Sequence, residues 1–386
     1  MRLPPLPRWL AGNRRRQTIA AGAGVSLVLV IAVVSLLAAG AFSDDGSPAP
    51  GLTATRTPAP TPTAASTPTP PPTEPTLLNG RLVYPEQLPE IQARLPLAIM
   101  FDNIVEARPQ VGLDKADLVF EAVAEGGITR FLAVFWSDKP GRVLAVRSSR
   151  TYYLDWAAGL DAIYVHWGSA RSSNPAADVP SALSSLGLRD FDGIRMAQPY
   201  FGRDPDRAAP HDGIADTDAM WELAATNGWD GPPAIEAWQF KDDEPQRAGA
   251  EDARVSTTID LGFGRSLSSS YTVRWEYDQK TNGYLRRQGG EPHRDGGSGE
   301  RIQARNVAVM VTSVRSADDG TGHLLYDTIG FGEAVVFQDG LAIPGTWSKP
   351  DPHSRIRFFD DGGREIAFNR GQTWIEVLSF AEPLLY

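Results

Sequence analysis

The chain has 386 residues, no cysteine and a formal net charge of −10 at neutral pH. The absence of cysteine excludes disulfides, thiolate metal sites, a cysteine nucleophile and lipid attachment through a cysteine. All 47 acidic residues follow residue 43, whereas five of the 37 basic residues precede it. The strongly acidic remainder argues against binding nucleic acid or anionic lipid through bulk charge attraction.

The first feature along the chain is an apolar stretch at residues 18–42 that contains no charged residue. At about 1.5 Å per residue it is long enough to cross a hydrocarbon core of roughly 30 Å. Because the basic segment 1–17 precedes it, the stretch predicts a single transmembrane helix with a cytoplasmic N-terminus and the rest of the chain outside. The alternative is a cleaved signal peptide with a small-residue cleavage site at Ala39-Gly40-Ala41. Both interpretations place the bulk of the chain outside the cytoplasm.

Residues 43–76 are rich in Pro, Thr and Ala. Such a composition cannot bury a core and predicts a stiff, extended linker, on the order of 100 Å long when stretched. Its threonines are candidate glycosylation sites on compositional grounds alone.

Two folded regions are expected after the linker. Residues 77–245 alternate strand and helix patterns, which indicates an α/β domain with a mixed sheet. Residues 246–386 contain many short strand patterns separated by Gly, Asp and Asn, which indicates a β-rich C-terminal module built on hairpins. Strands are predicted at 95–102, 117–125, 128–136 and 162–168, and helices at 176–186 and 217–227.

Several motifs resemble the YerB-like lipoprotein family. In the first region they are MFDN (100–103), ARPQVGL (107–113), ADLVFEAVAEGGITRF (116–131), VRSSRTYYLD (146–155) and VHWGSA (165–170); in the second they include HRD (293–295), ARNVAVM (304–310) and FNRGQTWIEV (368–377). The resemblance covers residues 80–386 and implies a bacterial, membrane-attached, extracytoplasmic protein with a domain of unknown function. The family name implies a lipidated cysteine, which this chain lacks, so the apolar helix is expected to anchor it instead.

Carboxylates form the first candidate site. Asp102 closes one predicted strand, and Glu121 and Glu125 lie four residues apart on the next. Even spacing in a strand places side chains on one face, so Glu121 and Glu125 are candidates for the acid/base pair that glycoside hydrolysis needs. The alternative is that they form structural ion pairs with Arg130, Arg147 or Arg150.

Arginines form the second candidate site. Arg108, Arg130, Arg147 and Arg150 all sit near predicted turns or strand ends. In an acidic domain, such a cluster is typical of a site for a carboxylate, phosphate or sugar-acid group. The alternative is a network that neutralises neighbouring carboxylates, and the two interpretations are compatible.

His166 ends a predicted strand at the sheet edge where ligands bind in open α/β folds, which makes it a candidate acid or base. His211 on a loop and Trp167 beside His166 are candidate substrate contacts, although packed positions in the fold are the alternative for each. His293 is expected in a hairpin, and His323 and His353 at the surface. No histidine spacing typical of a metal site and no nucleotide-binding motif is present, so we expect neither metal nor cofactor.

Together these features give two functional hypotheses for an anchored envelope protein. The first is a peptidoglycan glycosidase with Glu125 as the acid. The second is a non-catalytic scaffold that binds cell-wall glycan or recruits envelope proteins. The basic segment before residue 18 is too short to carry a signalling domain.

Overall fold

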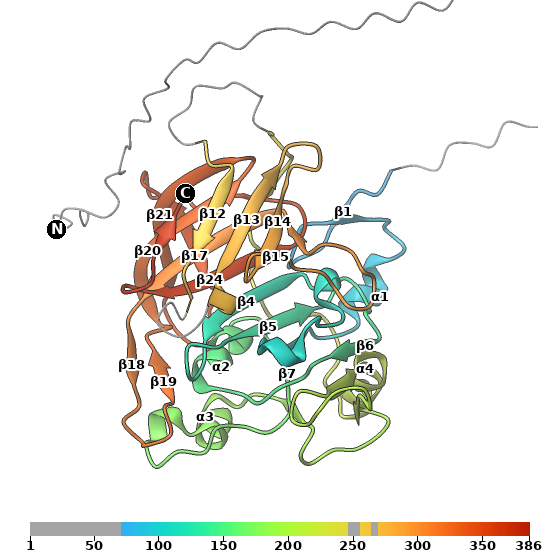
Figure 1. The fold of residues 1–386 in the computed structure, drawn as a ribbon. Coiled ribbons are helices and arrows are strands. Elements are labelled where there is room, and N and C mark those ends of the chain that lie inside the picture. The colour runs from blue at the N-terminus through green and yellow to red at the C-terminus, as the bar shows by residue number, and fades with distance from the viewer. Residues whose placement is uncertain (1–70, 246–254, 264–268) are drawn as a thin grey trace, which may run out of the picture. The chain divides into compact units, whose positions relative to one another are not determined.

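A computed structural model describes residues 71–245, 255–263 and 269–386 of the chain (Figure 1). The predicted transmembrane segment 18–42 and nearly all of the predicted linker lie outside these residues. The end of the linker, expected to be extended through residue 76, forms the short strand β1 (Glu74–Pro75) paired with β2 (Leu82–Val83). Within the described ranges, no helix combines the length and the apolar character needed to cross a membrane.

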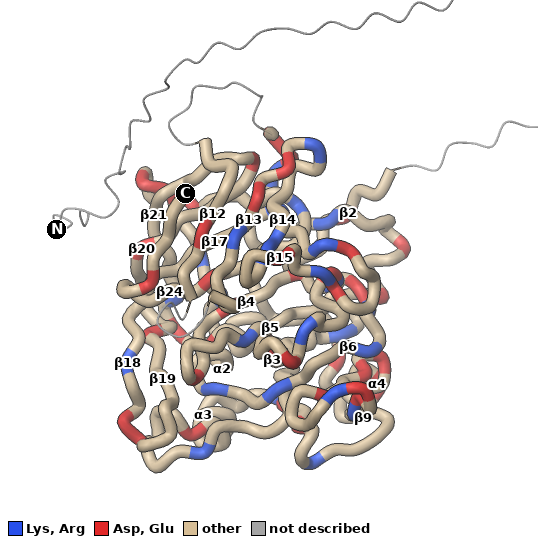
Figure 2. The backbone as a smooth tube through the Cα atoms, viewed as in Figure 1, with Lys and Arg blue, Asp and Glu red and all other residues tan. Residues whose placement is uncertain are grey.

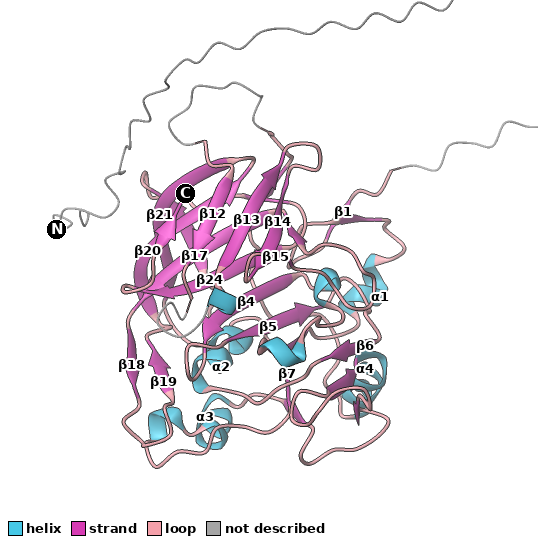
Figure 3. Cartoon of the chain, viewed as in Figure 1, coloured by secondary structure: helices cyan, strands magenta, loops and turns pink. Residues whose placement is uncertain are grey.

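One large mixed sheet organises the described part of the chain (Figure 3). Its ten strands are, in spatial order, β22 (Arg357–Asp360), β21 (Leu341–Lys349), β20 (Gly330–Gln338), β17 (Asn306–Thr312), β24 (Thr373–Ser379), β4 (Leu118–Val123), β5 (Thr129–Phe135), β3 (Leu97–Asp102), β7 (Ile163–His166) and β8 (Asp190–Asp192). The mixed sheet expected from the sequence is therefore present, and it dominates over the helices.

Strand β24 joins the two regions that the sequence separates. It runs parallel to β17 on one side and to β4 on the other, with Thr373 opposite Leu118. The strands predicted in 77–245 and those predicted in 246–386 thus pair within a single sheet.

The large sheet is buried on both faces. Leu97, Ile99 and Phe101 of β3 point into one core, and Ala98 and Met100 point into the other, as the period of two in a strand requires. The first core also contains residues of a second, six-stranded sheet and of helix α4 (Thr217–Thr226), and the second core contains residues of helices α2 (Thr151–Ala158) and α3 (Val179–Leu186). The large sheet therefore lies between a smaller sheet and a helical layer (Figure 1).

The six-stranded sheet comes from the C-terminal half. Its strands are β15 (Glu291–Pro292), β14 (Gly283–Gln288), β13 (Val273–Asp278), β12 (Thr258–Leu261) and β25 (Leu384–Leu385), with β16 (Gln303–Ala304) beside β14. Pairing along β12, β13 and β14 is antiparallel throughout, as the predicted hairpins require.

Smaller elements complete the described part of the chain. The remaining strands are β6 (Arg142–Leu144), β9 (Phe201–Arg203) and β10 (Gly213–Asp216), the pair β11 (Phe240–Lys241) and β23 (Phe368–Asn369), and the hairpin β18 (Val314–Ser316) and β19 (Leu324–Tyr326). The remaining helices are α1 (Leu88–Gln92) and the 3-10 turns η1 (Val105–Ala107), η2 (Leu113–Lys115), η3 (Pro175–Ala177) and η4 (Ser269–Tyr271).

The helices predicted at 176–186 and 217–227 correspond to α3 and α4, and each begins at an aspartate cap. Asp178 accepts a hydrogen bond from the Ser181 amide at 3.2 Å, and Asp216 accepts one from the Ala219 amide at 3.1 Å. These bonds satisfy amide groups that have no partner inside the helix.

Candidate functional site

The candidate site lies where strand β3 ends, strand β5 begins and the segment 147–150 leads into α2. Asp102, the last residue of β3, is the cross-strand partner of Arg130 on β5. Acidic and basic positions follow one another closely near this end of β3 (Figure 2). The motifs MFDN, EGGITRF and VRSSR therefore converge on one charged region.

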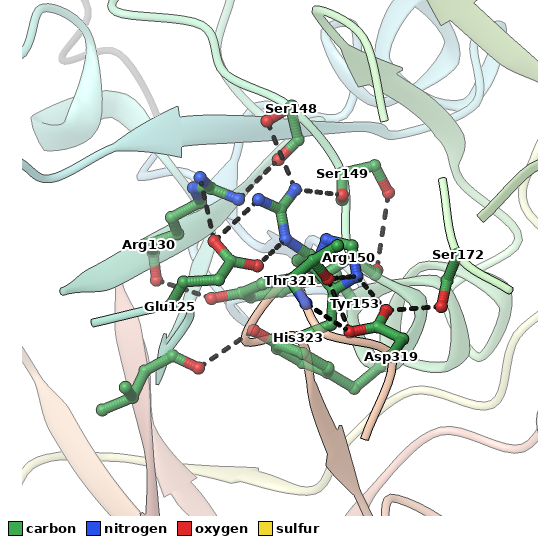
Figure 4. A network of polar contacts seen from close by, with 12 residues as sticks. Glu125, Arg130, Ser148, Ser149, Arg150, Tyr153, Ser172, Asp319, Thr321 and His323 are labelled. Atoms are coloured by element: carbon green, nitrogen blue, oxygen red, sulfur yellow. Dashed lines mark hydrogen bonds and ion pairs between the residues drawn. The ribbon is translucent and has the colours of Figure 1, made fainter. Parts of the chain in front are cut away.

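Glu125 is held by two arginines at this region (Figure 4). Arg150 donates a hydrogen bond to each carboxylate oxygen of Glu125, from Nη2 to Oε2 at 2.7 Å and from Nε to Oε1. Arg130 Nη2 lies 3.5 Å from Oε2. Burial alone would raise the pKa of Glu125, but the hydrogen bonds and charge of Arg150, with the charge of Arg130, outweigh it and lower that pKa. Glu125 is thus ionised at neutral pH, which is the opposite of what a general acid requires.

Asp102 presents a second pair of basic side chains. Its Oδ2 lies 2.9 Å from Arg147 Nε and 2.7 Å from His211 Nδ1. Asp102 is buried, whereas the side chains of Arg147 and His211 are 24% and 17% exposed. Among the described residues, neither the terminal guanidinium nitrogens of Arg147 nor His211 Nε2 has a hydrogen-bond partner. Both side chains are thus held by one carboxylate and are partly exposed, and we call Arg147 and His211 the basic pair.

The remaining arginines of the cluster already use most of their hydrogen-bond donors. Arg150 Nη1 donates to Ser149 O at 2.6 Å, in addition to the contacts with Glu125. Arg130 Nη1 donates to Ser148 O at 3.2 Å. Of the candidate arginines at this region, Arg147 therefore retains the most hydrogen-bonding capacity for a ligand.

Glu121 is not brought together with Glu125. Strand β4 ends at Val123, before Glu125, and the chain then turns through Gly126 and Gly127, both at positive φ. Glu121 points toward the six-stranded sheet and forms an ion pair with Arg286, and both side chains are 0% exposed. Glu121 and Glu125 therefore do not form the acid/base pair that we expected on one face of a strand.

Glu121 belongs to a buried cluster of Glu121, Arg286 and Glu376. Glu376 is the cross-strand neighbour of Glu121 on β24, and it accepts a hydrogen bond from Trp275 Nε1 at 2.8 Å. Burial, followed by the nearby Glu121 charge, raises the pKa of Glu376 well above its usual value, which favours the protonated form of this carboxyl. The Arg286 guanidinium lies 4.8 Å from the ring centre of Trp374. This cluster joins the two sheets and has no access to solvent.

Arg108 has its hydrogen bonds with Asn103 and the C-terminal half, not with Asp102. Its Nη1 donates to Ser270 O at 2.9 Å and its Nη2 to Asn103 O at 2.8 Å, and its guanidinium stacks over Tyr271 at 5.1 Å. Burial, with the charge of Arg286, lowers the pKa of Arg108 to about 10. Arg108 thus connects the N-terminal half to the C-terminal half.

His166 and Trp167 adjoin the basic pair, since the Trp167 amide donates to Arg147 O at 3.0 Å, but their side chains have other partners. His166 Nδ1 lies 2.8 Å from Gly168 O and Nε2 lies 3.2 Å from Asp190 Oδ2, so both ring nitrogens already have partners. His166 lines a pocket of about 490 Å³ that also contains Asp192 and Arg195. The indole of Trp167 stacks with Arg203 at 4.5 Å and packs closely against the backbone of Gly193, so it does not offer an open ring face.

Sequence reasoning missed two residues beside this region, Asp319 and His323. His323 was expected at the surface but is only 8% exposed, and its Nδ1 lies 2.6 Å from Asp319 Oδ2. Both come from the tip of the β18–β19 hairpin, next to Glu125 and Arg150 (Figure 4). The segment Asp318-Asp319-Gly320-Thr321-Gly322-His323 carries a signal, since it combines turn residues with an acid and a histidine. Across the described ranges, no group of three or more His, Asp and Glu side chains is arranged to hold a metal ion.

The chain was compared with known proteins. Residues 84–230 match the N-terminal domain of a family described as a protein of unknown function (DUF3048), and residues 264–375 match the C-terminal domain of that family. A putative lipoprotein YerB of Bacillus subtilis is 31% identical over 289 residues, which is 75% of this chain and 82% of that protein. A crystal structure of the YerB protein from Bacillus subtilis superposes with a TM-score of 0.68 at 27% identity, over 81% of this chain and all of that chain.

Proposed function

This chain belongs to the DUF3048 family of proteins of unknown function, and on that premise we propose that it is an extracytoplasmic cell-envelope protein that binds an anionic group of the wall polymer. The relative's name as a putative lipoprotein supports an envelope location. The apolar stretch at 18–42 supports attachment to the membrane, since the chain has no cysteine to carry a lipid. The Pro/Thr-rich segment after it is suited to hold the folded part away from the bilayer.

The basic pair is the observation that carries the binding function. Arg147 and His211 contact the same oxygen of Asp102, so their unpartnered nitrogens are oriented by one buried carboxylate. The terminal nitrogens of Arg147 are fixed donors, and they favour an anionic oxygen group because little side-chain freedom is lost on binding. With Nδ1 of His211 donating to Asp102, its Nε2 can accept a hydrogen bond from a hydroxyl or amide of the same ligand. Peptidoglycan offers such groups, since its sugar acids and peptide stems carry carboxylates.

Binding is supported better than glycoside cleavage. Most glycosidases use one carboxyl that is protonated at working pH and a second that is ionised, and both must reach the glycosidic bond. Glu125 has a lowered pKa, and Glu121 is fully buried. A non-catalytic role on the wall, the scaffold hypothesis, fits these two observations.

The test is co-sedimentation of the full-length protein in detergent with purified peptidoglycan sacculi. We expect Arg147→Ala to weaken binding by about tenfold, because charged hydrogen bonds to the ligand are lost. Arg142→Ala is the matched control, since Arg142 is an exposed arginine on β6 outside the site. Equal sedimentation of Arg147→Ala and wild type would refute the binding site, and soluble sugar products released by the wild type would show an enzyme instead of a binder.

A further inference from the structure

The hairpin β18–β19 brings the C-terminal half against the candidate site. Its tip is docked on the segment after β7: Asn174 Nδ2 donates to Ala317 O at 2.8 Å, and Ser172 Oγ donates to Asp319 Oδ2. The tip is also closed on itself, because the Ala317 amide donates to His323 O at 2.8 Å. The hairpin therefore holds His323 in a fixed position beside the N-terminal half.

His323 is a buried histidine with one unused nitrogen. Its Nδ1 lies 2.6 Å from Asp319 Oδ2 and 2.7 Å from Thr321 Oγ1, whereas its Nε2 has no hydrogen-bond partner among the described residues. More than nine-tenths of the residue is buried. A carboxylate at Nδ1 holds that nitrogen as the donor and fixes the ring, which leaves Nε2 able to accept a hydrogen bond from a ligand.

His323 lies at the far end of the same row of charged side chains as His211. His323 lies beside Glu125 and Arg150 at this edge of the sheet (Figure 4). Glu125 contacts Arg130, and Arg130 is the cross-strand partner of Asp102, which holds His211. The row thus begins at one Asp–His pair, Asp102–His211, and ends at another, Asp319–His323. Arg130, Arg150 and the second pair are seen in Figure 4.

We propose that the ligand is an extended polymer with a repeating anionic unit, and that it contacts both ends of this row: the anionic group of one unit binds at the basic pair, and a hydroxyl or amide N–H of the next unit donates a hydrogen bond to His323 Nε2. This inference rests on the proposed function, because it names the form of ligand that the same site takes. A single unit would reach only the basic pair. A polymer would gain a second hydrogen bond from the C-terminal half, and Asp319 would act as the positioning residue for that contact.

The experiment uses the full-length protein and two probes, intact sacculi and the disaccharide-peptide units released from the same sacculi by a muramidase. The key variants are His323→Asn and His323→Gln. The Asn amide occupies the position of Nδ1 and can keep the contact with Asp319, but it leaves the Nε2 position empty. The Gln amide reaches the Nε2 position. His353→Gln is the control, since His353 is an exposed histidine of the same half.

We expect His323→Asn to bind sacculi about fivefold more weakly, as for the loss of one hydrogen bond, and to bind the single units as the wild type does. His323→Gln should retain most of the affinity for sacculi. His211→Gln should weaken the binding of both probes, and His353→Gln should weaken the binding of neither. Thermal unfolding of each variant checks that the hairpin still folds.

Two outcomes separate this inference from the proposed function. If His323→Asn binds sacculi as the wild type does while Arg147→Ala does not, the second contact is wrong and the proposed site stands. If His323→Asn weakens the binding of single units and of sacculi equally, the two ends of the row do not bind successive units. The inference then also fails. If Arg147→Ala, His211→Gln and His323→Asn all bind normally, the proposed function itself is overturned.

Discussion

Glu121 and Glu125 are four residues apart and both meet an arginine, yet they belong to different kinds of site. The pair of Glu121 with Arg286 is fully buried between the two sheets, with Glu376 and Trp275 around it. The pair of Glu125 with Arg150 lies at the sheet edge, and the side chain of Glu125 is 25% exposed. A carboxylate–arginine pair alone therefore does not indicate a functional site. What distinguishes the edge is that neighbouring side chains, Arg147 and His211, keep nitrogens without partners.

The largest expected effect comes from breaking the buried pair. Arg286→Met leaves Glu121 without its buried cation, so we expect the free energy of unfolding to fall by about 3–5 kcal/mol. Arg287→Met is the matched control, because Arg287 is the next residue on the same strand and pairs with Glu276 in a partly exposed position. That control should cost no more than about 1 kcal/mol. Urea denaturation measures both, and equal costs would contradict the contrast between buried and exposed pairs.

A second prediction concerns the raised pKa of Glu376. Its pKa is raised in the folded protein, so the unfolded chain releases this proton first as the pH increases from 4.5. Glu376 therefore makes the folded state progressively less stable above pH 4.5, up to the raised pKa, by at most about 1.4 kcal/mol per pH unit.

Glu376→Gln replaces the neutral carboxyl with a neutral amide and removes this proton release. We expect the variant to lose less stability than the wild type between pH 5 and 7 in the same denaturation assay. Parallel pH profiles for the two proteins would show that Glu376 is ionised in the folded state.

The smallest effect is expected at the sheet edge. Glu125 has a lowered pKa, so its contribution to stability is present above pH 4.5 and is lost as the pH falls through the lowered value. Glu125→Gln should therefore reduce the free energy of unfolding at pH 7 by about 1–2 kcal/mol and flatten the acid side of the stability profile. A cost as large as that of Arg286→Met would mean that the edge pair is as structural as the buried one.

Much of the local structure could be predicted from the sequence. The strand patterns at 95–102 and 128–136 correspond to β3 and β5, and the resemblance to the YerB-like family is confirmed by the match to both DUF3048 domains. The pairing of β24 with β4 could not be predicted, because it joins residues more than 250 positions apart and strand patterns carry no information on distant partners.

For the candidate site, the sequence predicts which segments meet but not which side chains contact one another. Asp102, Arg130, Arg147 and Arg150 do converge, because their motifs end or begin adjacent elements. The sequence could not distinguish the saturated Arg150 from the partly unpartnered Arg147, since that depends on side-chain geometry at distances of 3 Å. The period of two failed for Glu125 because β4 ends two residues before it. His323 was missed because its place is set by the docking of a hairpin from the other half.

The central position of β24 has a consequence for how the chain is made. During synthesis from the N-terminus, β4 emerges with β5 on one side and with its other edge unpaired until residues 373–379 appear. An unpaired strand edge in a growing chain is open to wrong partners. We therefore expect the nascent protein to need protection from aggregation until almost the last strand is released. A premature stop codon before residue 373 would then be as damaging as one in the middle of the gene.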